Sequence, residues 1–192
     1  MKAYKLKIIL LTFTFILTSC GSDSNKKTSI DNFDNSFDAH DKFVELQKKK
    51  IVEAEKITKD LCDNFPKDLV LKYNPKGKRI EIEPVNFNSG KLDFCRIILV
   101  YGERNNATRG SVTARAPAGP NPLSRIKPVD GYIQKIEGFG DKAFYMNKDF
   151  KLTLSKNGLI YDLILPKDGS RTSIRDDLEV LLELATHYKL NN

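Results

Sequence analysis

The sequence is poor in histidine and lacks the residue patterns of common catalytic sites. Its two histidines, His40 and His187, stand near opposite ends, and helix capping or plain exposure explains them better than catalysis. The chain contains no nucleophile elbow, zinc-protease helix, P-loop or dinucleotide fingerprint. A lone G-x-G at Gly138 and Gly140 precedes Asp141 and is more typical of a tight turn than of a phosphate cradle. We therefore expect no enzyme and no cofactor.

A concentrated basic stripe with interleaved aromatics, which nucleic-acid binding requires, is also missing. The formal net charge is +7, and three of the lysines lie in the first seven residues, which leaves 7 − 3 = +4 for the rest of the chain. The longest basic run, 48–50, lies among Glu45, Glu53 and Glu55, so a solvated helix face is favoured over a membrane-surface patch. We expect no nucleic-acid partner.

Long apolar runs are absent except near the start. Lys2, Lys5 and Lys7 precede an apolar run at 8–17, and this order is typical of an export signal. At about 1.5 Å per residue the ten residues of this run span roughly 15 Å, about half of a bilayer core of about 30 Å. The sequence therefore predicts a cleaved signal peptide over 1–19, not a permanent transmembrane helix.

The end of this predicted signal resembles the lipobox of bacterial lipoproteins. The residues are Leu17, Thr18, Ser19 and Cys20, and the resemblance implies that Cys20 becomes acylated and amino-terminal. Because each buried CH₂ of an acyl chain contributes about 0.8 kcal/mol, two or three chains would hold the protein on the membrane. We expect a lipid-anchored protein of the cell envelope, on the outer membrane in a Gram-negative cell. An ordinary secreted protein with an incidental cysteine is the alternative.

Composition divides the remaining chain into a short linker and one domain. Residues 20–38 are rich in serine, aspartate and asparagine and predict a flexible tether. Residues 39–192 are enough for a single domain of ordinary size.

Cysteine is scarce as well, with three in the chain. With Cys20 assigned to the lipid, Cys62 and Cys95 remain as a pair in an oxidising compartment. We predict a Cys62 to Cys95 disulfide that stabilises the domain by roughly 3 to 4 kcal/mol, with two buried free thiols as the alternative. Two distant cysteines lack the paired spacing of zinc sites, so no metal is expected.

Apolar periodicity predicts helices at both ends of the domain and strands between them. An amphipathic helix is expected over 39–62, a short helix over 67–73, and a closing helix over 174–188. Strands are expected around Ile80 and Ile82 and over 92–101, 109–115, 132–136, 143–146, 151–154 and 159–165. Asn157 and Gly158 predict a type I′ hairpin turn between the last two. The fold class is therefore α+β, with an antiparallel sheet packed in two layers against an N-terminal and a C-terminal helix and held by one disulfide.

Residues 116–131 contain Pro117, Pro120, Pro122 and Pro128 and predict a long loop. Loops of this length are usually binding elements or simply mobile, and mobility is the favoured interpretation. Arg125 and Lys127 are the loop residues that we expect to contact a partner, if there is one.

Short motifs resemble a known class of lipoprotein. Leu61 with Cys62, Cys95 with Arg96, and the stretch 138–144 are similar to Cys-paired lipoprotein domains of unknown function, best known from actinobacteria. Those domains share a layered α+β fold with the photosystem protein PsbP. The resemblance covers residues 61–188 and implies that fold and a non-catalytic scaffold, with no functional residues to transfer.

These observations favour a non-catalytic envelope lipoprotein that binds an envelope protein or component through its sheet face and the 116–131 loop. The alternative is an immunity or inhibitor lipoprotein that neutralises a secreted toxin or wall hydrolase. An enzyme with an unrecognised site is the third hypothesis.

Overall fold

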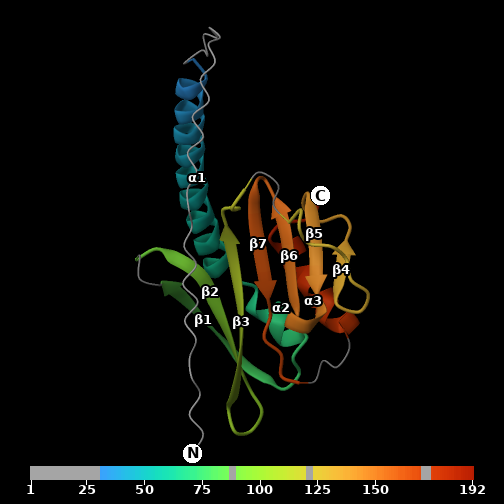
Figure 1. Ribbon diagram of the computed structural model, residues 1–192. Helices are drawn as coiled ribbons and strands as arrows, with labels where there is room; N and C mark the ends of the chain where they lie inside the picture. Colours follow the sequence, from blue (N-terminus) through green and yellow to red (C-terminus); the bar gives the residue numbers. More distant parts are fainter. Residues whose placement is uncertain (1–30, 87–89, 120–122, 170–173) are drawn as a thin grey trace, which may run out of the picture.

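The computed structural model describes residues 31–86, 90–119, 123–169 and 174–192, and the backbone alone for residues 31–40 and for 174 and 175. Within these residues the chain forms a seven-stranded antiparallel sheet with helices on one of its faces, as the sequence predicts (Figure 1). The predicted signal peptide and Cys20 lie outside the described residues. No helix within the described ranges is both long and apolar enough to cross a membrane.

The helices are α1 (Asp31–Asp63), α2 (Lys67–Lys72) and α3 (Ile174–His187), with one 3-10 turn, η1 (Asn147–Asp149). The strands are β1 (Gly77–Asn86), β2 (Leu92–Tyr101), β3 (Asn106–Arg115), β4 (Ile133–Ile136), β5 (Lys142–Met146), β6 (Lys151–Lys156) and β7 (Leu159–Ile164). Asn157 and Gly158, between β6 and β7, both have positive φ, as the predicted hairpin turn requires.

The sheet is built from two meanders that meet at its centre. Its strand order is β1-β2-β3-β7-β6-β5-β4, so the segment after β3 leads to the far edge and the chain then returns strand by strand to pair β7 with β3. Both meanders follow the sequence order of their strands, but the β3–β7 pairing joins residues about fifty positions apart and has no local sequence signal.

The core lies between the sheet and the helices. Alternate residues along each strand point into it, for example Cys95, Ile97 and Leu99 of β2. From the helix side, α3 contributes Leu181 and Leu184, which are almost completely buried. The central row of the sheet's inner face is continuous through the register pairs Cys95, Val112, Leu163, Leu152 and Tyr145.

The C-terminal end of α1 is tied to the sheet by a disulfide and by a threonine. Cys62 and Cys95 are bonded, with their Cα atoms 5.4 Å apart, so the predicted disulfide is confirmed. Thr58, which is 0% exposed, donates its hydroxyl hydrogen to the Ala114 carbonyl at 3.0 Å and accepts the Ala114 N–H at 2.9 Å. The β2–β3 ladder ends at the pair Cys95 and Val112, so Thr58 supplies the bonds that β2 no longer makes at Ala114.

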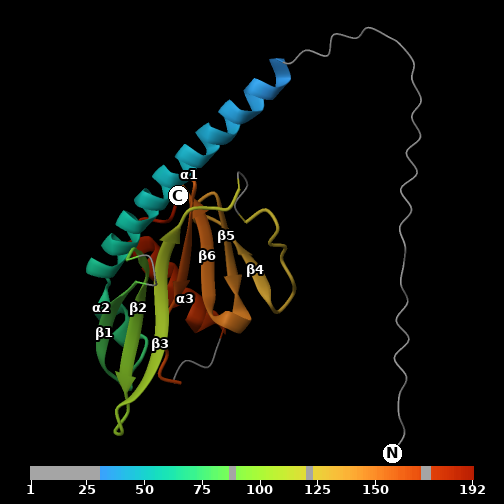
Figure 2. The same cartoon turned by 60° about the vertical axis from the view of Figure 1, so that its left-hand side comes forward.

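The N-terminal part of α1 extends beyond the domain (Figures 1 and 2). The helix begins at Asp31, eight positions before the predicted start and inside the predicted tether. A helix that is already nucleated adds one hydrogen bond for each residue fixed, so polar composition does not by itself end it. Phe43 and Leu46, which belong to the apolar pattern of the predicted amphipathic helix, are 44% and 51% exposed, because the sheet does not reach that far along α1.

The C-terminal residues of the chain bond to the glycine turn between β4 and β5. The Gly140 N–H donates to the Leu190 carbonyl at 3.0 Å, and the Asp141 N–H donates to the Ser155 carbonyl at 2.6 Å. Phe139 forms an isolated bridge with Asn191. Because these N–H groups are already bonded, the turn interpretation of the G-x-G motif fits better than a phosphate cradle.

Candidate functional site

The outer face of the sheet, turned away from the helices, is the candidate site, and we call it the open face. Its residues alternate in sequence with those of the core. One row across it is paired strand by strand and consists of Glu83, Arg96, Ser111, Ile164, Lys151, Met146 and Ile133. In contrast to the inner face, this row contains charged side chains from three strands.

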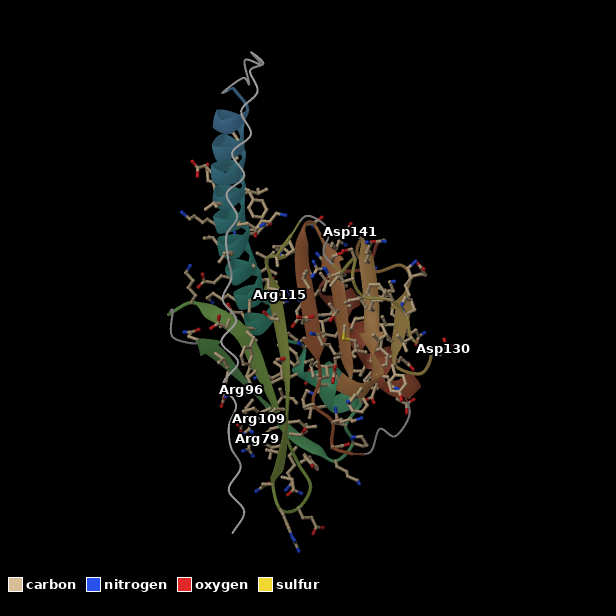
Figure 3. The ribbon with its side chains drawn as sticks, in the orientation of Figure 1. Arg79, Arg96, Arg109, Arg115, Asp130 and Asp141 are labelled. Atoms are coloured by element: carbon tan, nitrogen blue, oxygen red, sulfur yellow. A yellow bond between two sulfur atoms is a disulfide. The ribbon has the colours of Figure 1, made fainter. Side chains whose placement is uncertain are left out.

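Three arginines from adjacent strands, Arg79 of β1, Arg96 of β2 and Arg109 of β3, form what we call the arginine group. Arg79 pairs with Val100, and Arg109 pairs with Ile98. Ile98 and Val100 follow Arg96 at every second position of β2, so the three arginines lie on the same face of the sheet. Figure 3 shows the three labels close together on these strands, toward the end of the domain that is farthest from the start of α1. Three separate strands thus bring their arginines together on the open face.

Two members of the arginine group are partly neutralised. Arg79 Nε lies 2.7 Å from Glu81 Oε1, and Arg96 Nη1 lies 3.1 Å from Glu83 Oε2. These pairs are exposed, with 58% of the Arg79 side chain and 48% of the Glu83 side chain accessible. Exposed ion pairs are worth about 0 to 1 kcal/mol, so a competing carboxylate can replace the internal partner at little cost.

Arg109 differs from the other two because none of the described residues forms an ion pair with it. It is exposed, and its side chain makes no ion pair or hydrogen bond with any residue in the described part of the chain. The arginine group therefore presents one free guanidinium beside two that are loosely held.

Beneath the arginine group the surface is apolar. Ile98 and Val100 belong to the open face, yet they are only 8% and 4% exposed. Their cross-strand neighbours include Arg79 and Arg109, whose aliphatic stems can cover apolar atoms while the charged ends stay in water. Arginines above an apolar floor are a composition that is enriched at protein–protein interfaces.

A second charged cluster surrounds Asp162 in the middle of the open face. Its carboxylate accepts a hydrogen bond from Thr153 Oγ1 at 2.7 Å, and it lies 3.0 Å from Lys151 Nζ and 3.1 Å from Arg115 Nε. Burial acts to raise the pKa of Asp162, but the Thr153 hydrogen bond and the charges of Lys151 and Arg115 outweigh it and hold the pKa below its ordinary value. The Asp162 carboxylate is thus paired within this cluster, and we assign the cluster a structural role.

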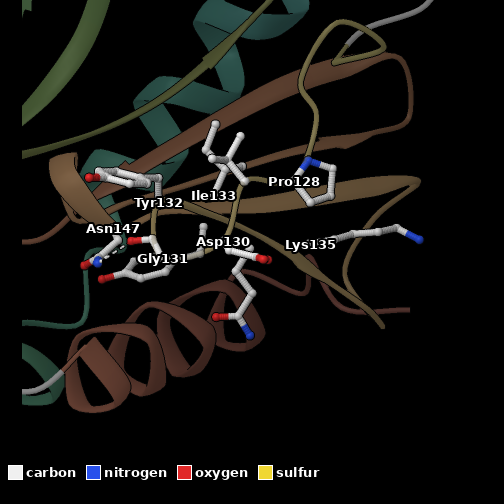
Figure 4. Close-up of a pocket in the computed structure, with 10 residues that line it drawn as sticks. Pro128, Asp130, Gly131, Tyr132, Ile133, Lys135 and Asn147 are labelled. Carbon is white, nitrogen blue, oxygen red and sulfur yellow. Dashed lines mark hydrogen bonds between the residues drawn. The ribbon is translucent and has the colours of Figure 1, made fainter.

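A hollow of about 360 Å³ lies at the opposite edge of the sheet, beside β4 (Figure 4). It is lined by the turn around Asp130 and Gly131, by Tyr132 and by Lys135. The Asn147 side chain donates to the Gly131 carbonyl at 3.1 Å and fixes this turn. Val129 and Tyr132 are 48% and 64% exposed, so the hollow has apolar walls that are open to solvent.

The residues predicted from the sequence do not gather at one site. Arg125 and Lys127 are exposed and belong neither to the strands of the open face nor to the lining of the hollow. Their role as partner contacts stays a prediction. His187 is exposed on α3, with Nε2 lying 3.1 Å from the Asn64 carbonyl oxygen, whereas the His40 side chain and Cys20 lie outside what the structure describes.

No cluster of three or more histidine, cysteine, aspartate or glutamate side chains able to hold a metal occurs among the described residues. Comparison of the chain with protein-family models, with curated proteins and with solved structures found no match. The resemblance to Cys-paired lipoprotein domains therefore stays a prediction from short motifs.

Sequence reasoning missed the arginine group. The alternation of Arg79, Glu81 and Glu83 with isoleucines indicates that these charges share one strand face. However, the cross-strand register brings Arg96 and Arg109 to the same place, and no local pattern encodes that register.

Proposed function

We propose that the protein is a bacterial lipoprotein of the cell envelope, anchored through lipid on Cys20, whose domain is a non-catalytic module that binds an envelope protein. In a Gram-negative cell we place it on the outer membrane. The observation that carries the binding proposal is the exposed arginine group above the apolar floor of Ile98 and Val100.

Two further features support this proposal. The side of the sheet that bears the helices is used for the core, which leaves the open face as the broad surface available for a partner. The arginine group also lies toward the end of the domain that is farthest from the start of α1, the helix that follows the proposed anchor (Figure 3).

The anchor is tested by the substitution Cys20→Ser in the full chain. The variant should appear in the soluble fraction or accumulate as an unprocessed precursor, because it lacks the sulfur that carries the lipid. Unchanged membrane retention of a processed protein would refute lipidation.

Binding is tested by photo-crosslinking in intact envelopes. A photoreactive residue at Ser111, within the open face, should give a defined protein adduct, whereas the same residue at Lys59, exposed on α1, should not. Recovery of a secreted toxin or wall hydrolase would establish the immunity or inhibitor alternative. Absence of any protein adduct at Ser111 contradicts the binding proposal.

A further inference from the structure

The arginine group has the charge and the spacing to hold an extended acidic peptide. Arg96 pairs with Ser111, and Arg109 stands two positions from Ser111 on the same strand, so the two arginines are diagonal neighbours across the ladder. Diagonal neighbours in an antiparallel pair are separated by about 7 to 8 Å. In an extended peptide, side chains on one side recur every second residue, at about 6.6 to 6.8 Å. The spacing of carboxylates on alternate residues of such a peptide therefore matches the backbone spacing of the two arginines.

The acidic residues beside the arginines disfavour a uniform polyanion. Glu81 and Glu83 share the open face with the arginine group and would repel a chain that bears a negative charge at every unit. A polypeptide can place neutral or apolar side chains over these glutamates. The mixture of positive and negative side chains thus favours a partner whose acidic residues alternate with uncharged ones over a phosphate polymer.

We propose that the arginine group is the docking site for an acidic, extended polypeptide segment of the partner, whose carboxylates alternate with uncharged residues. This inference rests on the proposed function, because it names the chemistry of the partner bound at the open face. Arg109 forms the first contact because no acidic side chain in the described ranges is paired with it. Arg96 and Arg79 exchange their internal glutamates for the carboxylates of the segment.

The experiment measures binding of synthetic peptides to the full chain, purified in a non-ionic detergent. An octapeptide in which glutamate and threonine alternate is compared with a block isomer of the same composition, and inorganic polyphosphate is the third probe. The alternating peptide should bind most tightly. Arg109→Ala should weaken it by about 10- to 150-fold, because the substitution removes a hydrogen bond to a charged group.

Two further variants separate docking from general charge attraction. Arg104→Ala removes an exposed charge from the turn between β2 and β3 and should leave the affinity unchanged. Glu81→Gln should tighten binding by up to about fivefold, because Arg79 loses its internal partner. A gain of affinity cannot arise from damage to the fold, so this variant keeps the test informative even where Arg109→Ala is destabilised.

Equal binding of the two peptides, tighter binding of polyphosphate, or an equal effect of Arg104→Ala and Arg109→Ala would each overturn the inference. These assays do not depend on the lipid. If the Ser111 crosslink forms in envelopes but the peptides fail to bind, the acidic-peptide inference falls and the proposed function stands. If the crosslink is also absent, the proposed function falls with it.

Discussion

Thr58 fastens α1 to the sheet, and replacing it with valine tests how much that hydroxyl contributes. The side chain is fully buried and satisfies both backbone groups of Ala114, at 3.0 and 2.9 Å. Valine keeps the shape but leaves the Ala114 N–H without a partner, while the Ala114 C=O keeps only the longer hydrogen bond from Thr113 Oγ1, at 3.3 Å. A buried unpaired polar group costs about 1 to 3 kcal/mol and a lost hydrogen bond about 0.5 to 1.5 kcal/mol, which together make about 1.5 to 4.5 kcal/mol. Because burial of the added methyl group recovers part of this, we expect Thr58→Val to lower the free energy of unfolding by about 1 to 4 kcal/mol.

Urea unfolding of the wild type, Thr58→Val and Thr58→Ser measures this difference. Serine keeps the hydroxyl and loses one methyl, which costs about 1 kcal/mol. The hydrogen-bond argument therefore predicts the stability order wild type, serine, valine. If packing alone mattered, Thr58→Val would be more stable than Thr58→Ser, and that order would falsify the argument. Amide exchange at Ala114 should also accelerate in the valine variant, because its N–H loses its acceptor.

Two more predictions concern stability. Replacing both Cys62 and Cys95 with alanine should lower the free energy of unfolding by about 3.7 kcal/mol, from the chain entropy of a loop with a sequence separation of 33; a loss under 1 kcal/mol in urea unfolding would contradict this. The pKa of Asp162 is lower in the folded state than in the unfolded state. Its ionised carboxylate therefore stabilises the fold fully above the unfolded pKa, near 3.8, and this stabilisation is lost as the pH falls through the lower folded pKa. The stability of Asp162→Asn should therefore fall less steeply than that of the wild type in acid, whereas the exposed control Glu81→Gln should follow the wild type; parallel slopes for wild type and Asp162→Asn would exclude this role.

Local patterns predict several elements of the fold closely. The run 92–101 is nearly apolar on both faces, and β2 has those same bounds, with four consecutive residues, Ile97 to Val100, buried. Asn157 and Gly158 form the predicted turn because few residues other than asparagine and glycine accept positive φ. The disulfide followed from the number of cysteines and the expected compartment, since only one pairing was possible.

Features that depend on distant partners could not be predicted in this way. Periodicity identified α1 but could not show that the sheet ends before Phe43 and Leu46, because a helix has the same apolar pattern whether or not a partner covers it. Similarly, the pairing of β3 with β7 and the meeting of Arg96 with Arg109 depend on strand register. The candidate site is therefore visible only once the strands are paired.

The position of the disulfide also has a mechanical consequence. A pull between an anchor before α1 and a partner held at the open face would enter the domain along the 33-residue helix. At Cys62 the tension would pass through the sulfur–sulfur bond to Cys95, and the next residue of that strand is Arg96, a member of the arginine group. Under the proposed anchoring and binding, the load would thus run from α1 to Arg96 through covalent bonds, bypassing α2 and β1. Tension would reach this strand without passing through the hydrogen bonds of the sheet.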